Sequence, residues 1–244
     1  MRIPVIRGVI DRRVLVNFRV DPTIVANILP SPFRPQLIHG YAIAGICLIR
    51  LKQTRMRFMP AMCGLTSENA AHRIAVEWDV DGVRRTGVYV PRRDTSSRLN
   101  AIVGGRVFPG THHHARFDVQ ENDDEFRIAM DSHDRQVSVG VDARLALELP
   151  ETSIFDSLTE VSEFFEQGSL GYSPNAEDNQ FDGLELQARN WHVEPLTVTN
   201  VESSYFDDPS IFPAGSVLFD NALLMRRIDH EWHERSTICA ELQS

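Results

Sequence analysis

Three consecutive histidines, His112, His113 and His114, are the residues of this chain whose type and spacing most directly suggest chemistry. Imidazole titrates near neutral pH, so a histidine can transfer protons, and it is also the commonest metal ligand in proteins. Side chains alternate between the two faces of a β-strand, so His112 and His114 share one face and His113 lies on the other. His113 shares its face with Ala115 and further apolar residues, which indicates that it points inward.

A metal site on this strand would need a third ligand from a neighbouring strand. Glu68, His72 and His192 are the candidates, but no spacing in the sequence fixes any of them as a ligand. His230 and His233 are three residues apart, whereas a zinc-protease helix needs histidines four residues apart. We therefore predict a polar pocket without a metal ion or another cofactor. A metal-dependent enzyme and a solvated strand face are the alternatives.

Lys52 is the only lysine of the chain, and all other basic side chains except histidine are arginines. A guanidinium stays charged at working pH, so an arginine binds a carboxylate and does not act as an amine nucleophile. Arg73 and Arg106 lie nearer to the proposed pocket, and we expect them to bind a substrate carboxylate in bidentate fashion. The arginines at 84–85 and 92–93 are expected at a solvated hairpin edge.

The composition narrows the class of protein and partner. The 244 residues are 42% hydrophobic and 24% charged, which is typical of a globular protein with a sizeable core. A net charge of −9 argues against nucleic acid and against an anionic membrane surface, because both need a basic face. Three well-separated cysteines, including Cys63, form no disulfide framework or zinc motif. With no signal peptide at the N-terminus, a cytoplasmic protein is expected.

The elements that must position these side chains are mostly strands. β-Branched residues predict a strand over 14–20, and apolar residues at both parities predict a strand over 41–52 that is buried on both faces. Asp81 and Gly82 predict a hairpin turn between the next two strands. Further strands are expected over 73–80, 85–90, 113–120, 125–130, 136–141, 184–189, 197–204 and 217–228.

Helices are few. Asp21 and Pro22 predict the start of a short helix, and apolar residues at helical spacing predict a helix over 154–167. Residues 172–179 are expected to form a loop. Since no repeat or linker divides the chain, residues 1–244 are expected to form one domain. The predicted fold class is β-dominated α+β, most simply a closed or nearly closed β-barrel with a few short outer helices.

Three parts of the chain resemble the acetoacetate decarboxylase-like superfamily. They are residues 13–21 with the helix that ends at 29–30, residues 105–109, and a block made of 191–196, 203–206 and 219–226. Together they span most of residues 12–228. The last block is similar to an uncharacterised branch of the superfamily that lacks the catalytic lysines. The resemblance implies a cone-shaped β-barrel with a pocket at its centre.

The resemblance breaks where the superfamily has its paired lysines, one of which forms the catalytic Schiff base. Aligning the aromatic-Pro turns puts Gly110 and Thr111 at those positions, and neither side chain can form an imine. Lys52 is expected at a solvated strand end. The superfamily's carboxylate corresponds loosely to Glu68. Decarboxylation through a Schiff base is therefore not expected.

We thus expect a barrel that binds a small organic acid or carbonyl compound, with Arg73, Arg106 and Thr111 contacting the ligand. Glu68 and the histidines His112, His113 and His114 would supply acid-base groups for a lyase, hydratase or isomerase step. A non-catalytic ligand-binding or structural protein is the alternative, because a fold does not establish a reaction. The sequence leaves open whether copies of the chain form a homo-oligomer.

Overall fold

The computed structural model describes residues 4–103, 110–175 and 179–240, and most of them lie in one hydrogen-bonded sheet of 13 strands. The strands are β1 (Ile6–Val20), β2 (Arg34–Pro35), β3 (Leu37–Ile38), β4 (Tyr41–Met56), β5 (Leu65–Val80), β6 (Val83–Thr95), β7 (His112–Glu121), β8 (Glu125–Ser132), β9 (Ser138–Leu145), β10 (Leu170–Pro174), β11 (Gln180–Ala188), β12 (Glu194–Ser203) and β13 (Val217–Cys239). The helices are α1 (Pro22–Ile28), α2 (Arg98–Val103) and α3 (Leu158–Gln167), with a 3-10 turn at Ala61–Cys63. Within these described ranges, no helix has the length and apolar character needed to cross a membrane.

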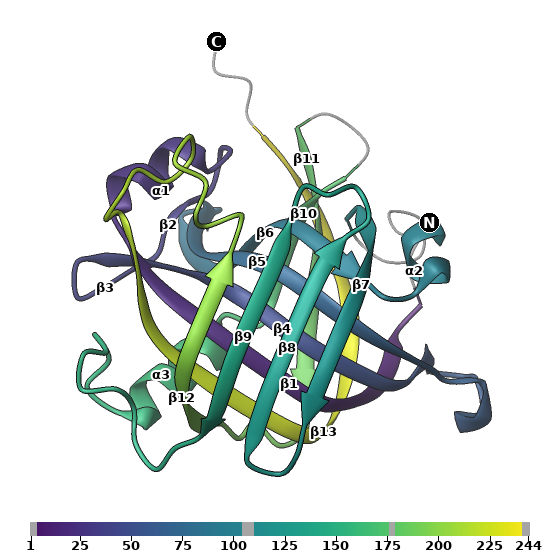
Figure 1. Ribbon diagram of the computed structural model, residues 1–244. Coiled ribbons are helices and arrows are strands. Elements are labelled where there is room, and N and C mark those ends of the chain that lie inside the picture. Colours follow the sequence, from purple (N-terminus) through teal and green to yellow (C-terminus); the bar gives the residue numbers. More distant parts are fainter. Residues whose placement is uncertain (1–3, 104–109, 176–178, 241–244) are drawn as a thin grey trace.

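The sheet closes on itself twice (Figure 1). The first ring runs through β6, β7, β8, β9, β12, β13, β1, β4 and β5, and the pairing of β5 with β6 closes it. The second ring uses β10 and β11 in place of β7, β8, β9 and β12, because β10 pairs with β6 and β11 pairs with β13. Five strands, β13, β1, β4, β5 and β6, therefore belong to both rings. The predicted β-dominated α+β fold with closed strand pairing and short helices is confirmed.

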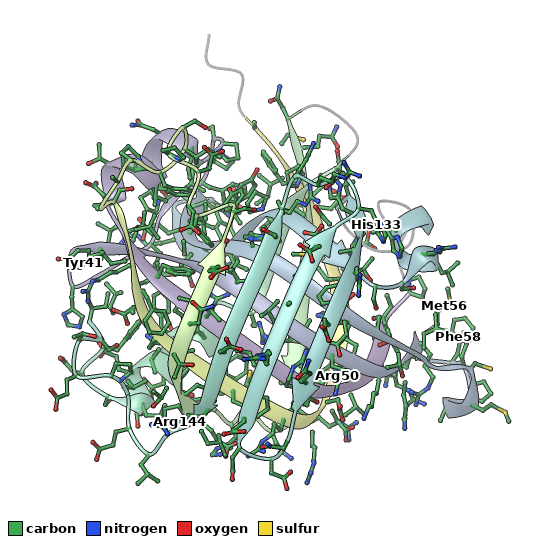
Figure 2. The ribbon with its side chains drawn as sticks, in the orientation of Figure 1. Tyr41, Arg50, Met56, Phe58, His133 and Arg144 are labelled. Atoms are coloured by element: carbon green, nitrogen blue, oxygen red, sulfur yellow. The ribbon has the colours of Figure 1, made fainter. Side chains whose placement is uncertain are left out.

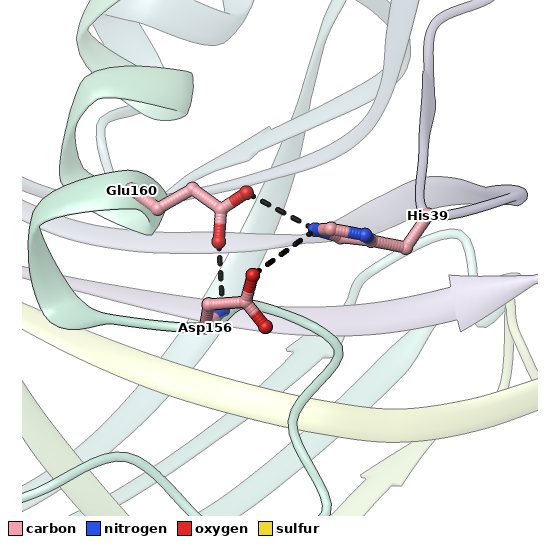
Figure 3. Close-up of side chains that lie close together, drawn as sticks. All are labelled: His39, Asp156 and Glu160. Atoms are coloured by element: carbon pink, nitrogen blue, oxygen red, sulfur yellow. Dashed lines mark hydrogen bonds and ion pairs between the residues drawn. The ribbon is translucent and has the colours of Figure 1, made fainter.

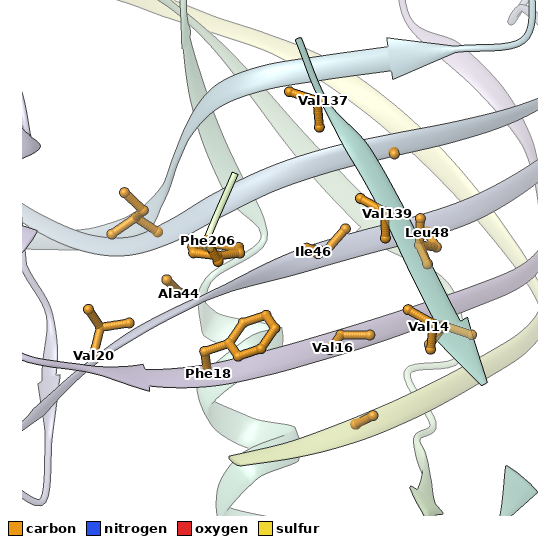
Figure 4. Close-up of a cluster of buried hydrophobic side chains, with 14 of the residues drawn as sticks. Val14, Val16, Phe18, Val20, Ala44, Ile46, Leu48, Val137, Val139 and Phe206 are labelled. Carbon is orange, nitrogen blue, oxygen red and sulfur yellow. The ribbon is translucent and has the colours of Figure 1, made fainter. Parts of the chain in front are cut away.

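The shared strands β1 and β4 are buried on both faces, as the apolar residues at both parities predicted. One face, which includes Val14, Val16 and Ile46, points into the first ring and packs against β9 (Figure 4). The opposite face, which includes Leu15 and Ile43, packs with residues of α3 and β11. The two faces of the shared strands therefore belong to two separate apolar clusters.

Two turn and cap signals of the sequence are confirmed. Asp21 is the N-cap of α1, and its Oδ1 accepts a hydrogen bond of 2.8 Å from the backbone N–H of Thr23. Asp81 and Gly82 form the turn between β5 and β6 with φ angles of 52° and 75°. Two successive positive φ angles match the twist of a tight hairpin, which explains the Asp-Gly pair.

The structure corrects the start of the helix predicted over 154–167. The helix α3 begins at Leu158, because the side chain of Ser157 accepts a hydrogen bond from a backbone N–H of the first turn. Ser153, which directly precedes the predicted helix and could also have capped it, instead donates its hydroxyl to the buried carboxylate of Asp220 at 2.7 Å. Ser153 and Ser157 are both suitable caps by residue type. The contact of Ser153 with the distant Asp220 leaves Ser157 as the cap.

Two strand predictions also need correction. The loop predicted over 172–179 includes most of β10, which is stabilised by pairing with both β6 and β11. The strand predicted to end at 228 continues to Cys239, because its second half pairs with β11. Both errors concern the second ring, whose closure depends on pairings between distant segments.

Gly45 allows β4 to lie close to β1. A Cβ atom at Gly45 would be 2.2 Å from the carbonyl oxygen of Val16 and 3.3 Å from the Cα of Asn17. We expect Gly45→Ala to push the strands apart and to lower the free energy of unfolding by about 1–3 kcal/mol. Denaturant unfolding measures this loss. Gly140→Ala is the matched control, since its Cβ would meet nothing nearer than 3.9 Å, and equal losses in the two variants would contradict the prediction.

Candidate functional site

The interior of the second ring contains a cavity of about 140 Å³. All seven strands of that ring contribute to its wall, together with the first residue of β7. Its polar and sulfur-containing lining residues are Arg13, Cys47, Thr54, Asn69, Arg73, Arg93, Asp94, His112 and Ser169. A cavity of roughly 150 Å³ can hold a molecule the size of benzene, so this one has room for a small organic acid.

Three arginines line the cavity without a carboxylate partner among the described residues. Arg73 is only 4% exposed; its Nη2 donates to Asn17 Oδ1, and its guanidinium carbon lies 4.4 Å from the centre of the Phe165 ring. The Nε of Arg73 is buried and has no hydrogen-bond partner. The Nε of Arg93 donates to the hydroxyl of Ser173 at 2.9 Å.

Arg13 contacts two sulfur atoms. Its Nε donates to Cys47 Sγ at 3.2 Å, and its Nη1 lies 3.7 Å from Met225 Sδ. Neither contact neutralises the guanidinium charge. Arg13 therefore adds a third positive charge to a cavity that already contains those of Arg73 and Arg93.

Burial affects the protonation of Arg73 and Arg93. It lowers the pKa of Arg73 to about 9, with a further decrease caused by the charge of Arg13. Burial also lowers the pKa of Arg93 to about 10. Both groups stay mostly protonated at neutral pH, so the cavity holds desolvated positive charge. A buried cation without a partner is costly, and an anion entering the cavity would remove that cost.

His112 is the histidine of the three that lines this cavity. Its Nδ1 lies 3.1 Å from the carbonyl oxygen of Gly110. Since a carbonyl only accepts, Nδ1 carries the proton and Nε2 is the basic nitrogen of the neutral ring. Burial, with the nearby charge of Arg93, lowers the pKa of His112 to about 4. The ring is therefore neutral at physiological pH.

Glu68 lies outside this cavity. It is on the opposite face of β5 from Arg73, and its Oε2 accepts a hydrogen bond of 2.6 Å from Arg12 Nη2. Arg50 also donates to Glu68, and both arginines donate to Glu121 at the end of β7. The structure thus places Glu68 in a charge cluster of two arginines and two glutamates. Figure 2 shows Arg50 and His133 at opposite ends of the β7–β8 hairpin.

The other two histidines of the run also lie apart from the cavity. His113 Nδ1 is 3.1 Å from Asp134 Oδ2, on the face of β7 that lines the first ring. The ring of His114 stacks on that of His133 with centroids 4.3 Å apart. The structure therefore brings Arg73 and His112 together, and it places His113 and His114 elsewhere.

Two predicted ligand-binding residues remain. Thr111 is exposed and is not among the residues that line the cavity. Arg106 lies outside the described residues.

A Schiff base needs a lysine amine in the cavity. Among the described residues, no lysine lines it. Lys52 is 47% exposed, and its Nζ pairs with Asp11 Oδ2 at 2.9 Å. Gly110, aligned with a superfamily lysine, has φ 78°, and a Cβ there would lie 2.6 Å from the Cβ of Ser173. The backbone at Gly110 therefore has no room for a side chain of any kind.

One group of side chains in the described ranges brings three metal-ligand atoms within 4.8 Å of one another: His39, Asp156 and Glu160 (Figure 3). His39 Nε2 lies 3.1 Å from Glu160 Oε1, while Glu160 Oε2 accepts from the backbone N–H of Asp156 at 2.7 Å. These are the contacts of a helix N-terminus on the molecular surface. The cluster is separate from the cavity and from the histidine run.

Sequence reasoning missed Arg93 and Cys47. Arg92 and Arg93 were expected at a solvated edge, but Arg92 is 8% exposed and Arg93 lines the cavity. The pairing of β6 with β5 shifts by one residue between Tyr89 and Arg92. Val90 lines the cavity, so strict alternation along the strand would place Arg92 there. Because of the shift, Arg93 lines the cavity instead. Cys47 belongs to an apolar run, and nothing in that run distinguishes it from a core residue.

The architecture matches solved structures of acetoacetate decarboxylase-like proteins. The acetoacetate decarboxylase of Legionella pneumophila superposes with a TM-score of 0.60 at 11% identity, covering 95% of this chain and 87% of that chain. An acetoacetate decarboxylase-like enzyme from Sphingomonas wittichii gives 0.58 at 10% identity, covering 99% and 94%. The enduracididine biosynthesis enzyme MppR, complexed with pyruvate, gives 0.58 at 12% identity, covering 100% and 93%. This chain therefore has the acetoacetate decarboxylase-like fold, as its sequence predicted.

The sequence also identifies a family within that fold. Residues 10–219 match the model of DUF2071, described as an uncharacterized conserved protein. The chain belongs to the DUF2071 family. No curated protein gives a significant match to its sequence.

Proposed function

We propose that the cavity of the second ring binds a small organic anion, a carboxylate of a few carbon atoms. The observation that carries this proposal is the presence of Arg13, Arg73 and Arg93 in one cavity without a carboxylate partner among the described residues. Arg73 is buried, and Arg13 and Arg93 are half-buried. The one carboxylate that the described residues contribute to the wall, that of Asp94, pairs with Arg92. This concentration of unneutralised charge is unfavourable unless a ligand supplies the negative charge. A planar guanidinium also matches the geometry of a carboxylate, which it can bind through two hydrogen bonds.

His112 is the acid-base group of the proposed site. With a pKa of about 4 it is a weak base in the empty cavity. A carboxylate bound at Arg93 would cancel part of the positive charge that lowers this pKa, so His112 would become more basic when the ligand is present. This arrangement suits proton transfer at a carbon next to a carbonyl, the step shared by many lyases, hydratases and isomerases.

The proposed chemistry does not pass through an imine. Lys52 is the only lysine of the chain, and it pairs with Asp11 outside the cavity. Reduction with borohydride in the presence of pyruvate or acetoacetate is therefore expected to leave the protein mass unchanged. A covalent adduct on Lys52 would overturn this part of the proposal.

Binding measurements test the anion site directly. The protein is titrated with acetate, pyruvate, acetoacetate and benzoate, and with methyl pyruvate as the neutral counterpart. We expect at least one carboxylate to bind, and pyruvate to bind more tightly than its ester. Arg73→Gln should weaken the binding by about 10- to 150-fold, because a hydrogen bond to a charged group contributes about 1.5–3 kcal/mol.

The control for this test is Arg116→Gln, since Arg116 is exposed on β7 and does not line the cavity. It should leave the affinity unchanged. Absence of binding by all four carboxylates would contradict the proposal. So would equal affinities for pyruvate and methyl pyruvate.

A further inference from the structure

Cys47 lies inside the cavity in contact with one of its arginines. It is on β4, it is 7% exposed, and its side chain contributes to the cavity wall. The Nε–H of Arg13 on the adjacent strand points at its sulfur across 3.2 Å. The other two cysteines, Cys63 and Cys239, are exposed and lie outside the cavity. The three thiols of this chain therefore occupy very different surroundings.

The surroundings of Cys47 suit a nucleophile. The thiolate is the reactive form of cysteine, and neighbouring arginines stabilise its negative charge. Besides the contact with Arg13, the sulfur of Cys47 acts electrostatically on Arg73 and Arg93 and opposes the decrease in their pKa values. Arg13 thus contacts this sulfur, and Arg73 and Arg93 line the same cavity.

A second observation shows that the same place is built for a ligand. Arg73 is 4% exposed and lines the cavity, its Nε has no hydrogen-bond partner, and no described carboxylate pairs with it. A polar atom buried in this way is normally satisfied by a ligand or a water. The buried guanidinium would hold a ligand's carboxylate in the same cavity as the Cys47 sulfur.

We propose that Cys47 is a nucleophile that bonds to an electrophilic carbon of a small carboxylate bound in the cavity, such as the carbonyl carbon of a 2-oxo acid. This inference rests on the proposed anion site. In the step, the sulfur–carbon bond forms and the π bond of the carbonyl breaks. The thiol proton ends on the former carbonyl oxygen, which gives a hemithioketal. No oxidant or reductant is needed, and the arginines keep their protons.

The experiment compares two alkylating reagents that differ in charge. In both, a sulfur–carbon bond forms as the carbon–iodine bond breaks, iodide leaves with the bonding electrons, and the thiol proton goes to solvent. Iodoacetate carries a carboxylate, whereas iodoacetamide is neutral. Peptide mapping of the full-length protein gives a rate for each cysteine, so Cys63 and Cys239 are internal references in the same sample.

We expect the ratio of the iodoacetate rate to the iodoacetamide rate to be at least 10-fold higher at Cys47 than at Cys63 or Cys239. Arg13→Gln should lower the iodoacetate rate at Cys47 by at least 10-fold, while Arg116→Gln should not change it. Equal ratios at the three cysteines, or no modification of Cys47, would overturn the inference.

Binding by Cys47→Ser separates this inference from the proposed function. If Cys47 is unreactive while wild type and Cys47→Ser bind pyruvate alike, the nucleophile is wrong and the anion site stands. If neither protein binds any carboxylate, the proposed function fails and the inference fails with it. Support for both requires carboxylate binding together with selective alkylation. In ¹³C NMR spectra, the signal of pyruvate labelled at C2 should then move from the carbonyl region to the tetrahedral region when wild type is added. It should stay in the carbonyl region when Cys47→Ser is added.

Discussion

Acidification from about pH 7.5 to about pH 4.5 is expected to lower the free energy of unfolding by about 7–8 kcal/mol, because His72, His230 and the cavity residue His112 resist protonation. His72 is 0% exposed, and neither of its ring nitrogens has a hydrogen-bond partner. Burial, together with the charge of Arg92, lowers the pKa of His72 to about 3. His230 is 2% exposed, and burial together with Arg13 lowers its pKa to about 4.

The direction of the effect follows from the number of protons bound in each state. An unfolded histidine has a pKa of about 6.5, so below that pH it binds a proton that the native residue does not bind. Stability is therefore lost as the pH falls from 6.5 towards the native values. Each histidine contributes about 1.4 kcal/mol per pH unit, and together they approach the whole stability of a typical domain.

Denaturant unfolding at a series of pH values measures this loss. His72→Met should remove about a third of it, because two of the three histidines remain. The apolar side chain keeps the packing against Tyr205, whose ring centre lies 4.8 Å from that of His72. The variant should also be as stable as wild type or more stable at pH 7, since it removes two unsatisfied nitrogens. His192→Gln is the control, because His192 is exposed, and it should leave the pH dependence unchanged. An unaltered slope in His72→Met would show that other groups cause the acid sensitivity.

The parts of the fold that the sequence predicted are those set by local residue patterns. Apolar residues at both parities over 41–52 indicated burial on both faces, and Asp81-Gly82 indicated the β5–β6 hairpin. The short strand β10 carries no such pattern. It exists because Gly171 and Tyr172 pair with β6 on one side while β11 pairs on the other. Closure of the second ring is thus a property of distant segments, which no local pattern reports.

The same distinction applies to the candidate site. Strand parity predicted that His112 and His113 point to opposite faces, and the structure places only His112 of the two at the cavity, together with Arg73. However, the contents of the cavity depend on strand pairing as well as on residue type. A one-residue shift in β6 turns Arg93 into the cavity. Arg13 on the neighbouring strand donates a hydrogen bond to the sulfur of Cys47, although the sequence pattern indicates only a core residue at that position.

The charge cluster around Glu68 allows the sharpest test of a structural role against a catalytic one. Glu68→Gln is expected to lower the free energy of unfolding by about 3–5 kcal/mol, the cost typical of removing one partner from a buried ion pair. The side chains of Arg12 and Glu68 are only 3% and 15% exposed. After the substitution, Arg12 would keep only Glu121 as a carboxylate partner among the described residues. Arg50 would keep Glu121 and the more distant Asp11.

Asp142→Asn is the matched control, because its partner Arg127 is 68% exposed and a surface ion pair contributes about 1 kcal/mol or less. Thermal or denaturant unfolding of the two variants gives the comparison. At a temperature where Glu68→Gln remains folded, its affinity for carboxylates should equal that of wild type, because Glu68 and Arg73 lie on opposite faces of β5. A variant with normal stability and a 10-fold weaker affinity would instead place Glu68 in the ligand site. The two readouts therefore separate a residue that holds the first ring together from one that acts on a ligand in the second.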